Sequence, residues 1–197
     1  MVLFKNAGKQ NTEECVTLGL KRAMELNCDI VASSTMGVTA DVLLTKAKEM
    51  GFQNKIVIVR GCSSKARGGM NLMKPEVKEE LIARGAIIVT PAHALSAGER
   101  GISAKSRGIY PLELMAETLR CFGQGTKVCF ETAVMALDAD AISYGVPVVA
   151  MGGSHRGVDT ACVVTPGHSA NLLETVVNEI ICKPFDIVNP DPSMTFD

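Results

Sequence analysis

Short apolar runs alternate with longer polar stretches along the chain, and this alternation predicts the strands. Residues 55–60 read Lys-Ile-Val-Ile-Val-Arg, so the four central positions are all apolar and β-branched. Runs of this kind are typical of parallel strands that are covered by helices on both faces. The pattern predicts five strands in chain order, at residues 29–33, 55–60, 86–90, 146–151 and 161–165.

Capping residues and helical spacing predict helices between these strands. A first helix from Asn11 to about Asn27 begins with Asn-Thr-Glu-Glu, in which a capping side chain precedes two acids that favour the first turn. Gly51 is a natural end for a second helix. Further helices are predicted at residues 39–50, 75–84 and 111–122, and from Thr126 onward. Two segments fit either a helix or a strand, namely residues 127–130 and 175–182.

The order of these elements predicts the architecture. Three units of strand, loop and helix follow one another, which indicates a parallel sheet with right-handed crossovers and helices on both faces. Residues 91–108 break this rhythm and predict a long loop excursion. Residues 189–197, which contain Pro190-Asp191-Pro192, predict a loose tail. We therefore expect one α/β domain over residues 1–197.

Two loops rich in glycine and hydroxyl residues follow predicted strands and are similar in sequence. Residues 34–40 read Ser-Thr-Met-Gly-Val-Thr-Ala, and residues 154–161 read Ser-His-Arg-Gly-Val-Asp-Thr-Ala, with Asp159 as one insertion. The N–H groups and hydroxyls of such a loop, with the positive end of the next helix, favour an anion and above all phosphate. The alternative is an ordinary turn whose hydroxyls only cap the helix.

Two histidines and two arginines lie near the ends of predicted strands. His93 follows residues 86–90 and His155 follows residues 146–151, and Arg100 and Arg156 are close to them in the sequence. At the carboxyl ends of strands, all four side chains are candidates for ligand contact. The alternatives are surface histidines with local hydrogen bonds, and arginines paired with acids nearby in the sequence.

Glu131 lies in an apolar predicted helix, where we expect it to be buried. A buried acid is either paired for structural reasons or perturbed for function, and the sequence leaves both interpretations open.

Composition restricts the class of ligand and the compartment. Hydrophobic residues make up 47% of the chain and aromatic residues only 4%, so the core is expected to consist of Val, Ile, Leu, Ala and Met. A formal net charge of −1 argues against nucleic acid, whose binding requires many phosphate contacts. The seven cysteines form no C-x-x-C pair and several lie in apolar runs, so we expect no metal site and a reducing compartment. The N-terminus is too short and too soon charged for a signal peptide, and no apolar run approaches a membrane span, so we expect a cytoplasmic protein without membrane contact.

The chain resembles the small archaeal and bacterial proteins of unassigned function that are called pyruvate kinase alpha/beta domain-like, or pyruvate kinase C-terminal domain-like. The resemblance is carried by residues 33–40, 93–100 and 152–161, and it extends from residue 11 to residue 184. It implies a three-layer α/β/α fold with a mostly parallel five-stranded sheet, in the order 3-2-1-4-5 with strand 5 antiparallel. In such a sheet, ligands bind beyond the carboxyl ends of the strands where the order switches, here between the first and fourth strands.

The resemblance also implies a ligand. In pyruvate kinase the similar loop binds a phosphate of the sugar bisphosphate activator, and the family is associated with flavin mononucleotide (FMN). Together with the polar residues above, this gives the expected cofactor-binding set: Ser33, Ser34, Thr35, Met36, Gly37, Thr39, His93, Arg100, Gly153, Ser154, His155, Arg156 and Thr160.

The leading hypothesis is a domain that binds a phosphorylated small molecule, with FMN as the first candidate. It is expected to form a homo-oligomer, as the related part of pyruvate kinase does. The alternatives are a flavin-dependent oxidoreductase, or an acid/base enzyme that uses His93 and His155 on a phosphorylated metabolite. We do not expect a pyruvate kinase, because phosphoryl transfer in that enzyme takes place in a separate barrel domain for which 197 residues leave no room. The chain also lacks a G-x-x-x-x-G-K-[ST] loop.

Overall fold

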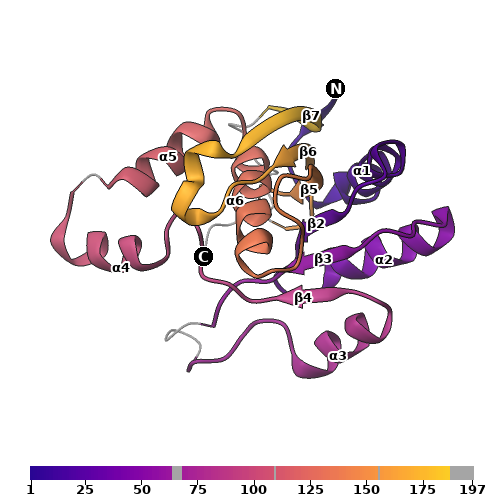
Figure 1. Ribbon diagram of the computed structural model, residues 1–197, viewed down its shortest axis with the longest axis horizontal. Helices are drawn as coiled ribbons and strands as arrows, with labels where there is room; N and C mark the ends of the chain where they lie inside the picture. The colour runs from indigo at the N-terminus through magenta and orange to yellow at the C-terminus, as the bar shows by residue number, and fades with distance from the viewer. Residues whose placement is uncertain (64–67, 109, 155, 187–197) are drawn as a thin grey trace.

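The computed structural model describes residues 1–63, 68–108, 110–154 and 156–186, so the predicted loose tail at 189–197 lies outside the described residues. The chain is mixed α/β, as predicted (Figure 1). Its elements in chain order are β1 (Val2–Asn6), the short helix η1 (Lys9–Asn11), α1 (Thr12–Leu26), β2 (Ile30–Ser33), α2 (Val38–Met50), β3 (Ile56–Val59), α3 (Pro75–Ala83), β4 (Ile87–Val89), α4 (Ala97–Ser106), α5 (Pro111–Arg120), α6 (Gln124–Asp138), β5 (Val148–Gly152), β6 (Thr160–Thr165), the short helix η3 (Ser169–Glu174) and β7 (Val176–Asp186).

The seven strands of the described chain form one sheet in the order β1-β7-β6-β5-β2-β3-β4. β2 pairs in parallel with β3 on one side and with β5 on the other. β6 runs antiparallel to both of its neighbours, β5 and β7. The chain leaves β2 toward β3 and β4 and later returns to β5 on the opposite side of β2. The strand order therefore switches direction between β2 and β5.

The predicted count of five strands is wrong, because two further strands, β7 and β1, extend the sheet beyond β6 and so change the order of the whole sheet. Among themselves, the five predicted strands keep the expected order 3-2-1-4-5, with the fifth antiparallel to the fourth. The five predicted segments follow one another as β4, β3, β2, β5 and β6. Residues 175–182, which fitted either a helix or a strand, lie mostly in β7. β1 pairs in parallel with β7, with Val2 opposite Cys182. Of its five residues only Phe4 is buried, and the apolar run Val2-Leu3-Phe4 does not alternate with polar residues, so no strand was predicted there.

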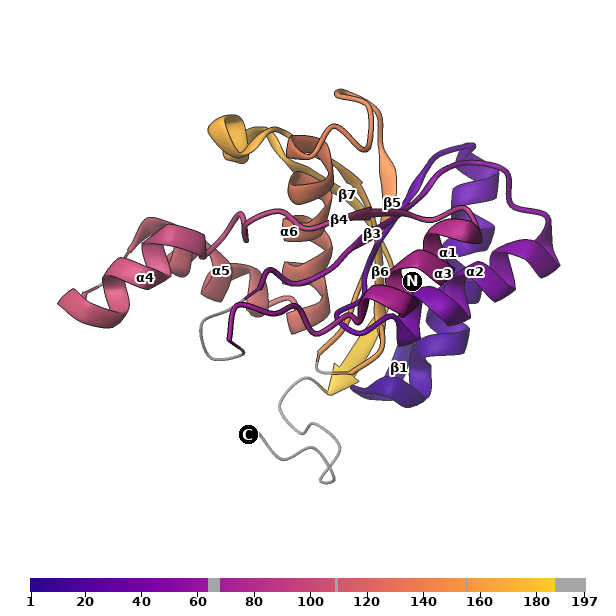
Figure 2. The ribbon, with the colours of Figure 1, turned by 90° about the horizontal axis from the view of Figure 1, so that it is seen from below.

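Helices cover both faces of the sheet, with α1, α2 and α3 on one side and α6 on the other (Figure 2). Side chains of the central strands alternate between these two layers. In β2, Ile30 and Ala32 belong to the core on the α1 and α2 side, whereas Val31 belongs to the core under α6. Burial on both faces explains why consecutive positions of these strands are apolar.

The first two helices end where the sequence predicts. Asn27 after α1 has φ 49°, and Gly51 after α2 has φ 71°, so both are left-handed C-caps. Within the described residues, no helix is both long enough and apolar enough to span a membrane.

Most of the predicted loop excursion at residues 91–108 is in fact helical, because it contains α4. No residue of α4 is buried, so the apolar periodicity that predicts a helix is missing there. Glu99 connects α4 to α5, since its Oε1 accepts hydrogen bonds from the N–H groups of Leu112 at 2.8 Å and Glu113 at 3.0 Å. These N–H groups belong to the first turn of α5 and have no acceptor within that helix. Together α4 and α5 project from the α6 side of the molecule (Figure 1).

Residues 127–130, which fitted either a helix or a strand, lie in the helix α6. This helix packs directly on the sheet where Gly125 of α6 meets Gly152 of β5. It begins at Gln124, two residues before the predicted start. A Cβ on Gly125 would lie 2.1 Å from Oγ1 of Thr160, and a Cβ on Gly152 would lie 2.6 Å from the carbonyl oxygen of Gly125. Neither position has room for a side chain, so the first turn of α6 lies against the carboxyl end of β5 and the start of β6.

Gly125→Ala should lower the free energy of unfolding by about 1–3 kcal/mol, because the added methyl group must displace Thr160 or move α6 away from the sheet. For a chain of this length we expect a fall in Tm of roughly 2–4 °C per kcal/mol, measured by thermal unfolding. Gly98→Ala in α4 is the matched control, because no other group lies within 4 Å of the added Cβ. Equal Tm values for the two variants would contradict the close packing of α6.

Candidate functional site

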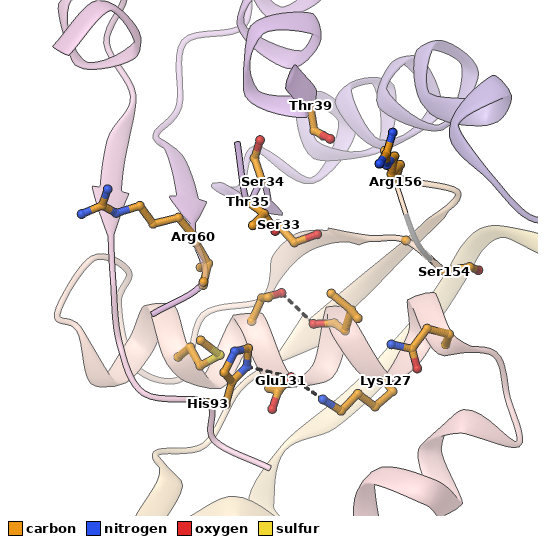
Figure 3. A pocket seen from close by; sticks show the side chains of 18 of the residues that line it. Ser33, Ser34, Thr35, Thr39, Arg60, His93, Lys127, Glu131, Ser154 and Arg156 are labelled. Carbon is orange, nitrogen blue, oxygen red and sulfur yellow. Dashed lines mark hydrogen bonds and ion pairs between the residues drawn. The ribbon is translucent and has the colours of Figure 1, made fainter. Parts of the chain in front are cut away.

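A cleft of about 1140 Å³ opens beyond the carboxyl ends of β2 and β5, where the strand order switches direction (Figure 3). Open α/β sheets commonly bind ligands at this place. The walls are formed by the β2–α2 loop, the segments after β3 and β4, the helices α5 and α6, and the β5–β6 loop. Ten of the thirteen predicted binding residues line the cleft: Ser33, Ser34, Thr35, Met36, Thr39, His93, Arg100, Gly153, Ser154 and Arg156.

Two of the other three predicted residues are not among those that line the cleft. Gly37 is the N-cap of α2 with φ 102°, and a Cβ there would lie 2.5 Å from Val77 of α3. It therefore serves the turn and the packing of helices. Thr160 is completely buried, and its hydroxyl donates a hydrogen bond to Oδ1 of Asp159 at 3.0 Å. The third residue, His155, lies outside the described residues.

Ser34 caps α2, as the alternative interpretation of this loop proposed. Its Oγ accepts a hydrogen bond from the N–H of Ala40 at 3.2 Å, and its own N–H donates to the carbonyl oxygen of Val59 at 3.1 Å. The oxygen of the Ser34 hydroxyl is therefore already used as an acceptor within the protein. The side chains of Ser33 and Thr35 line the same wall (Figure 3).

Thr39 places a buried hydroxyl on this wall. The residue is only 4% exposed, and its hydroxyl has no hydrogen-bond partner among the described residues. In the same part of the chain, the N–H groups of Val38 and Thr39 in the first turn of α2 have no acceptor. A buried polar group without a partner costs about 1–3 kcal/mol, and the N-terminus of a helix carries partial positive charge. An anion at this position would satisfy these donors.

The β5–β6 loop is held in place by Asp159. Its Oδ2 accepts hydrogen bonds from the N–H groups of Gly8 at 2.9 Å and Ser154 at 3.4 Å. Burial raises the pKa of Asp159, although these hydrogen bonds favour the charged form. Asp159 thereby attaches the segment before α1 to this wall of the cleft.

Four cationic side chains of the cleft form no ion pair with any acid in the described ranges. Arg156 is exposed at the rim, near Thr39 (Figure 3). From the sequence, the alternative for Arg156 and Arg100 was a salt bridge with an acid nearby in the chain, and neither arginine forms one with the described residues. Arg60 and Lys9 also line the cleft, and Nε of Arg60 donates a hydrogen bond to Oγ1 of Thr90 at 2.7 Å.

The opposite wall carries a charged cluster of His93, Lys127 and Glu131 (Figure 3). Lys127 and Glu131 lie one turn apart on α6 and form a salt bridge, with side chains only 8% and 4% exposed. Oε1 of Glu131 accepts a hydrogen bond from the N–H of Leu95 at 3.0 Å, and its Oε2 lies 3.6 Å from Nδ1 of His93. The side chain of His93 is 42% exposed and lines the cleft.

Glu131 is ionised at neutral pH despite its burial. Burial by itself raises the pKa of this carboxyl, but His93 and Lys127 beside it outweigh that effect and lower the pKa from 4.5 to about 2. A buried ion pair seldom contributes more to stability than apolar side chains of the same size. Its position on a cleft therefore favours a functional interpretation.

The sequence contained part of the signal for this cluster. Glu131 is buried, as predicted, but Lys127 was not among the predicted site residues. Lys127 could have been found from its spacing, because a lysine and a glutamate four residues apart in an apolar helix lie on the same face and can pair. Arg60 follows an apolar strand like many surface arginines, and nothing in its neighbourhood singled it out.

Other polar clusters lie away from the cleft. His168 is near the C-terminal end of α6, where its Nδ1 lies 3.0 Å from Oδ1 of Asp138 and its ring stacks on Tyr144 at a centroid distance of 5.6 Å. No group of three or more His, Cys, Asp or Glu residues in the described part of the chain is arranged to hold a metal ion.

Glu131→Gln should lower the free energy of unfolding at neutral pH by about 3–5 kcal/mol, because it leaves Lys127 buried without a counter-charge. Since the pKa of Glu131 is lowered by folding, its stabilising effect is present above 4.5 and is lost as the pH falls toward about 2. The difference between wild type and variant should therefore narrow over this range. Urea unfolding at a series of pH values measures it.

Glu117→Gln is the matched control for this measurement. Glu117 pairs with Arg120 in the same part of the molecule, but its side chain is 68% exposed. We expect its loss to change the free energy of unfolding by less than about 1 kcal/mol. A Glu131→Gln effect as small as that of the control, or one that does not change with pH, would contradict the assigned role.

No protein-family model matches the chain. The resemblance to the pyruvate kinase C-terminal domain-like proteins therefore stays a prediction. The function has to be inferred from the chemistry of the cleft.

Proposed function

We propose that the cleft binds the phosphate group of a small molecule, with FMN as the first candidate ligand. The observation that carries this proposal is the set of donors at the start of α2. The hydroxyl of Thr39 is buried without a partner, and the N–H groups of Val38 and Thr39 have no acceptor in the described chain. A phosphate group has several strong acceptor oxygens and a charge that suits a helix N-terminus.

Positive charge around the cleft supports an anionic ligand. The whole chain has a formal net charge of only −1, whereas six Lys or Arg residues and four Glu residues line the cleft, so the positive charge is in local excess there. Lys9, Arg60, Arg100 and Arg156 line the cleft, and none of them forms an ion pair within the described ranges. Unpaired cations in a concave site concentrate anions, and the planar guanidinium of Arg156 can donate two hydrogen bonds to one phosphate.

The size and the rim of the cleft favour a ligand that is larger than phosphate alone. Small-molecule sites usually occupy about 300–1,000 Å³, and this cleft measures about 1140 Å³. Apolar side chains line part of it while remaining accessible, with exposed fractions of 49% for Met36, 68% for Val38 and 41% for Leu72. FMN combines a phosphate with a flat ring system that such side chains would cover, and it is the ligand that the resemblance implies.

Thr39→Val should weaken the binding of both inorganic phosphate and FMN by about tenfold, because it removes one hydrogen bond to a charged group and keeps the shape of the side chain. A ligand that binds only the native state raises Tm with its concentration, so thermal unfolding measures both affinities. Quenching of flavin fluorescence gives a second measurement for FMN.

Thr118→Val in α5 is the matched control, because that hydroxyl is exposed and donates only to the carbonyl oxygen of Leu114. We expect its affinities to equal those of the wild type. If neither phosphate nor FMN raises Tm, the proposal is wrong. If phosphate raises Tm and FMN does not, the phosphate site stands and the ligand is a different phosphorylated molecule.

A further inference from the structure

We propose that His93 is a general acid/base that transfers a proton on a phosphorylated carbonyl compound, with Glu131 and Lys127 as its positioning residues. The proposal rests on the phosphate site inferred above, and it adds the substrate class and the reaction of that cleft. The geometry that points to it is an imidazole open to the cleft with one ring nitrogen beside a buried carboxylate.

Glu131 determines which nitrogen of His93 faces the cleft. Its carboxylate is held on two sides, by Lys127 and by the N–H of Leu95 at 3.0 Å. An ionised carboxylate only accepts hydrogen bonds, so in the proposed arrangement the nearby Nδ1, 3.6 Å away, is the nitrogen that carries the proton of the neutral imidazole. The lone pair is then on Nε2, which has no partner in the described part of the chain. Contacts of this length commonly shorten when a ligand closes the site.

Lys127 completes the arrangement by balancing the charge of Glu131. The two side chains are almost completely buried, so Glu131 orients the imidazole without adding net negative charge to the wall. An apolar pair would fill the same space in α6, but it would not orient the imidazole.

In this proposal, one wall of the cleft binds the phosphate group of the substrate and the opposite wall transfers the proton. Thr39 and the first turn of α2 lie on one wall, and His93 and Glu131 lie on the other (Figure 3). A phosphate bound at α2 would therefore hold the rest of the molecule between the walls. Positioning of this kind is the main way in which remote binding contributes to catalysis.

Proton transfer next to a carbonyl group requires few other residues. Hydrolysis of the serine type needs a hydroxyl hydrogen-bonded to the histidine, and within the described ranges no Ser or Thr hydroxyl donates to His93. In the proposed step, Nε2 of His93 removes a proton from the carbon beside the carbonyl. The electron pair of that C–H bond moves into the carbonyl group and forms an enolate, and the imidazolium returns a proton to the same carbon. No electrons are gained or lost overall, so no oxidant or reductant is required.

The test is the exchange of carbon-bound hydrogen with D₂O, followed by ¹H NMR. The probes are dihydroxyacetone phosphate, glyceraldehyde 3-phosphate and ribulose 5-phosphate, each of which has a carbonyl group and a phosphate. We expect the wild type to catalyse exchange in at least one probe, and His93→Gln to lower that rate by at least about 100-fold. The rise in Tm with inorganic phosphate should be the same in both proteins. His168→Gln is the matched control, because His168 lies away from the cleft and its loss should leave exchange unchanged.

A second measurement tests the positioning residues without any substrate. Long-range ¹H–¹⁵N NMR reports which nitrogen of a histidine carries the proton, and we expect Nδ1 for His93. The double variant Lys127→Met/Glu131→Gln removes both charges together and so avoids an unpaired buried ion. In this double variant, His93 should no longer carry its proton mainly on Nδ1, and the pH profile of exchange should shift. If the pair had only a structural role, neither measurement would change.

Exchange at the wild-type rate in His93→Gln would overturn the proposal. The proposal would also be overturned by the absence of exchange in every probe that raises Tm, or by a proton on Nε2 of His93. In these cases the phosphate site remains intact. If neither phosphate nor any phosphorylated probe raises Tm, the phosphate site itself is wrong, and the proposed reaction falls with it.

Discussion

The position of the cleft depends on the direct contact between α6 and the carboxyl end of β5. Gly125 and Gly152 have no side chains, so the first turn of the helix lies on the sheet itself. The first two turns of α6 then carry Lys127 and Glu131 to the edge where the strand order switches. A larger residue at either glycine would move both charges away from His93. The packing of small residues therefore determines where the polar chemistry of this protein lies.

The two walls of the cleft satisfy their polar groups in different ways. On the α6 wall, the buried carboxylate of Glu131 is neutralised by Lys127 and held by the N–H of Leu95, so little is left for a ligand to satisfy. On the α2 wall, the hydroxyl of Thr39 and the N–H groups of the first turn remain without partners among the described residues. Proteins tolerate unsatisfied buried donors where function requires them, at some cost in stability. The α2 wall is therefore the one that gains most from a bound anion.

Prediction from the sequence was most accurate where a segment is buried on both faces. β2 and β3 were predicted because consecutive apolar residues fill β3 and all of β2 except Ser33, in a sheet that helices cover on both sides. β1 and α4 were missed because they bury little or nothing and so show no periodicity. In the candidate site, ten of the residues named from the sequence line the cleft, because loops after parallel strands meet at one edge of the sheet. It could not exclude Gly37 and Thr160, whose neighbours Val77 and Asp159 decide their roles.

By itself, the sequence determined the local elements of this protein. Runs of β-branched residues specify strands, residues such as Gly51 end helices, and hydroxyls and glycines mark the loops that follow the strands. These features depend on neighbours a few residues away, so they can be derived from the chain alone. Only the tertiary structure decided that Ser34 caps α2 while Thr39 stays available, and that His93 meets a salt bridge on α6. The physical reason is that the environment of each polar group is set by contacts between segments far apart in the sequence.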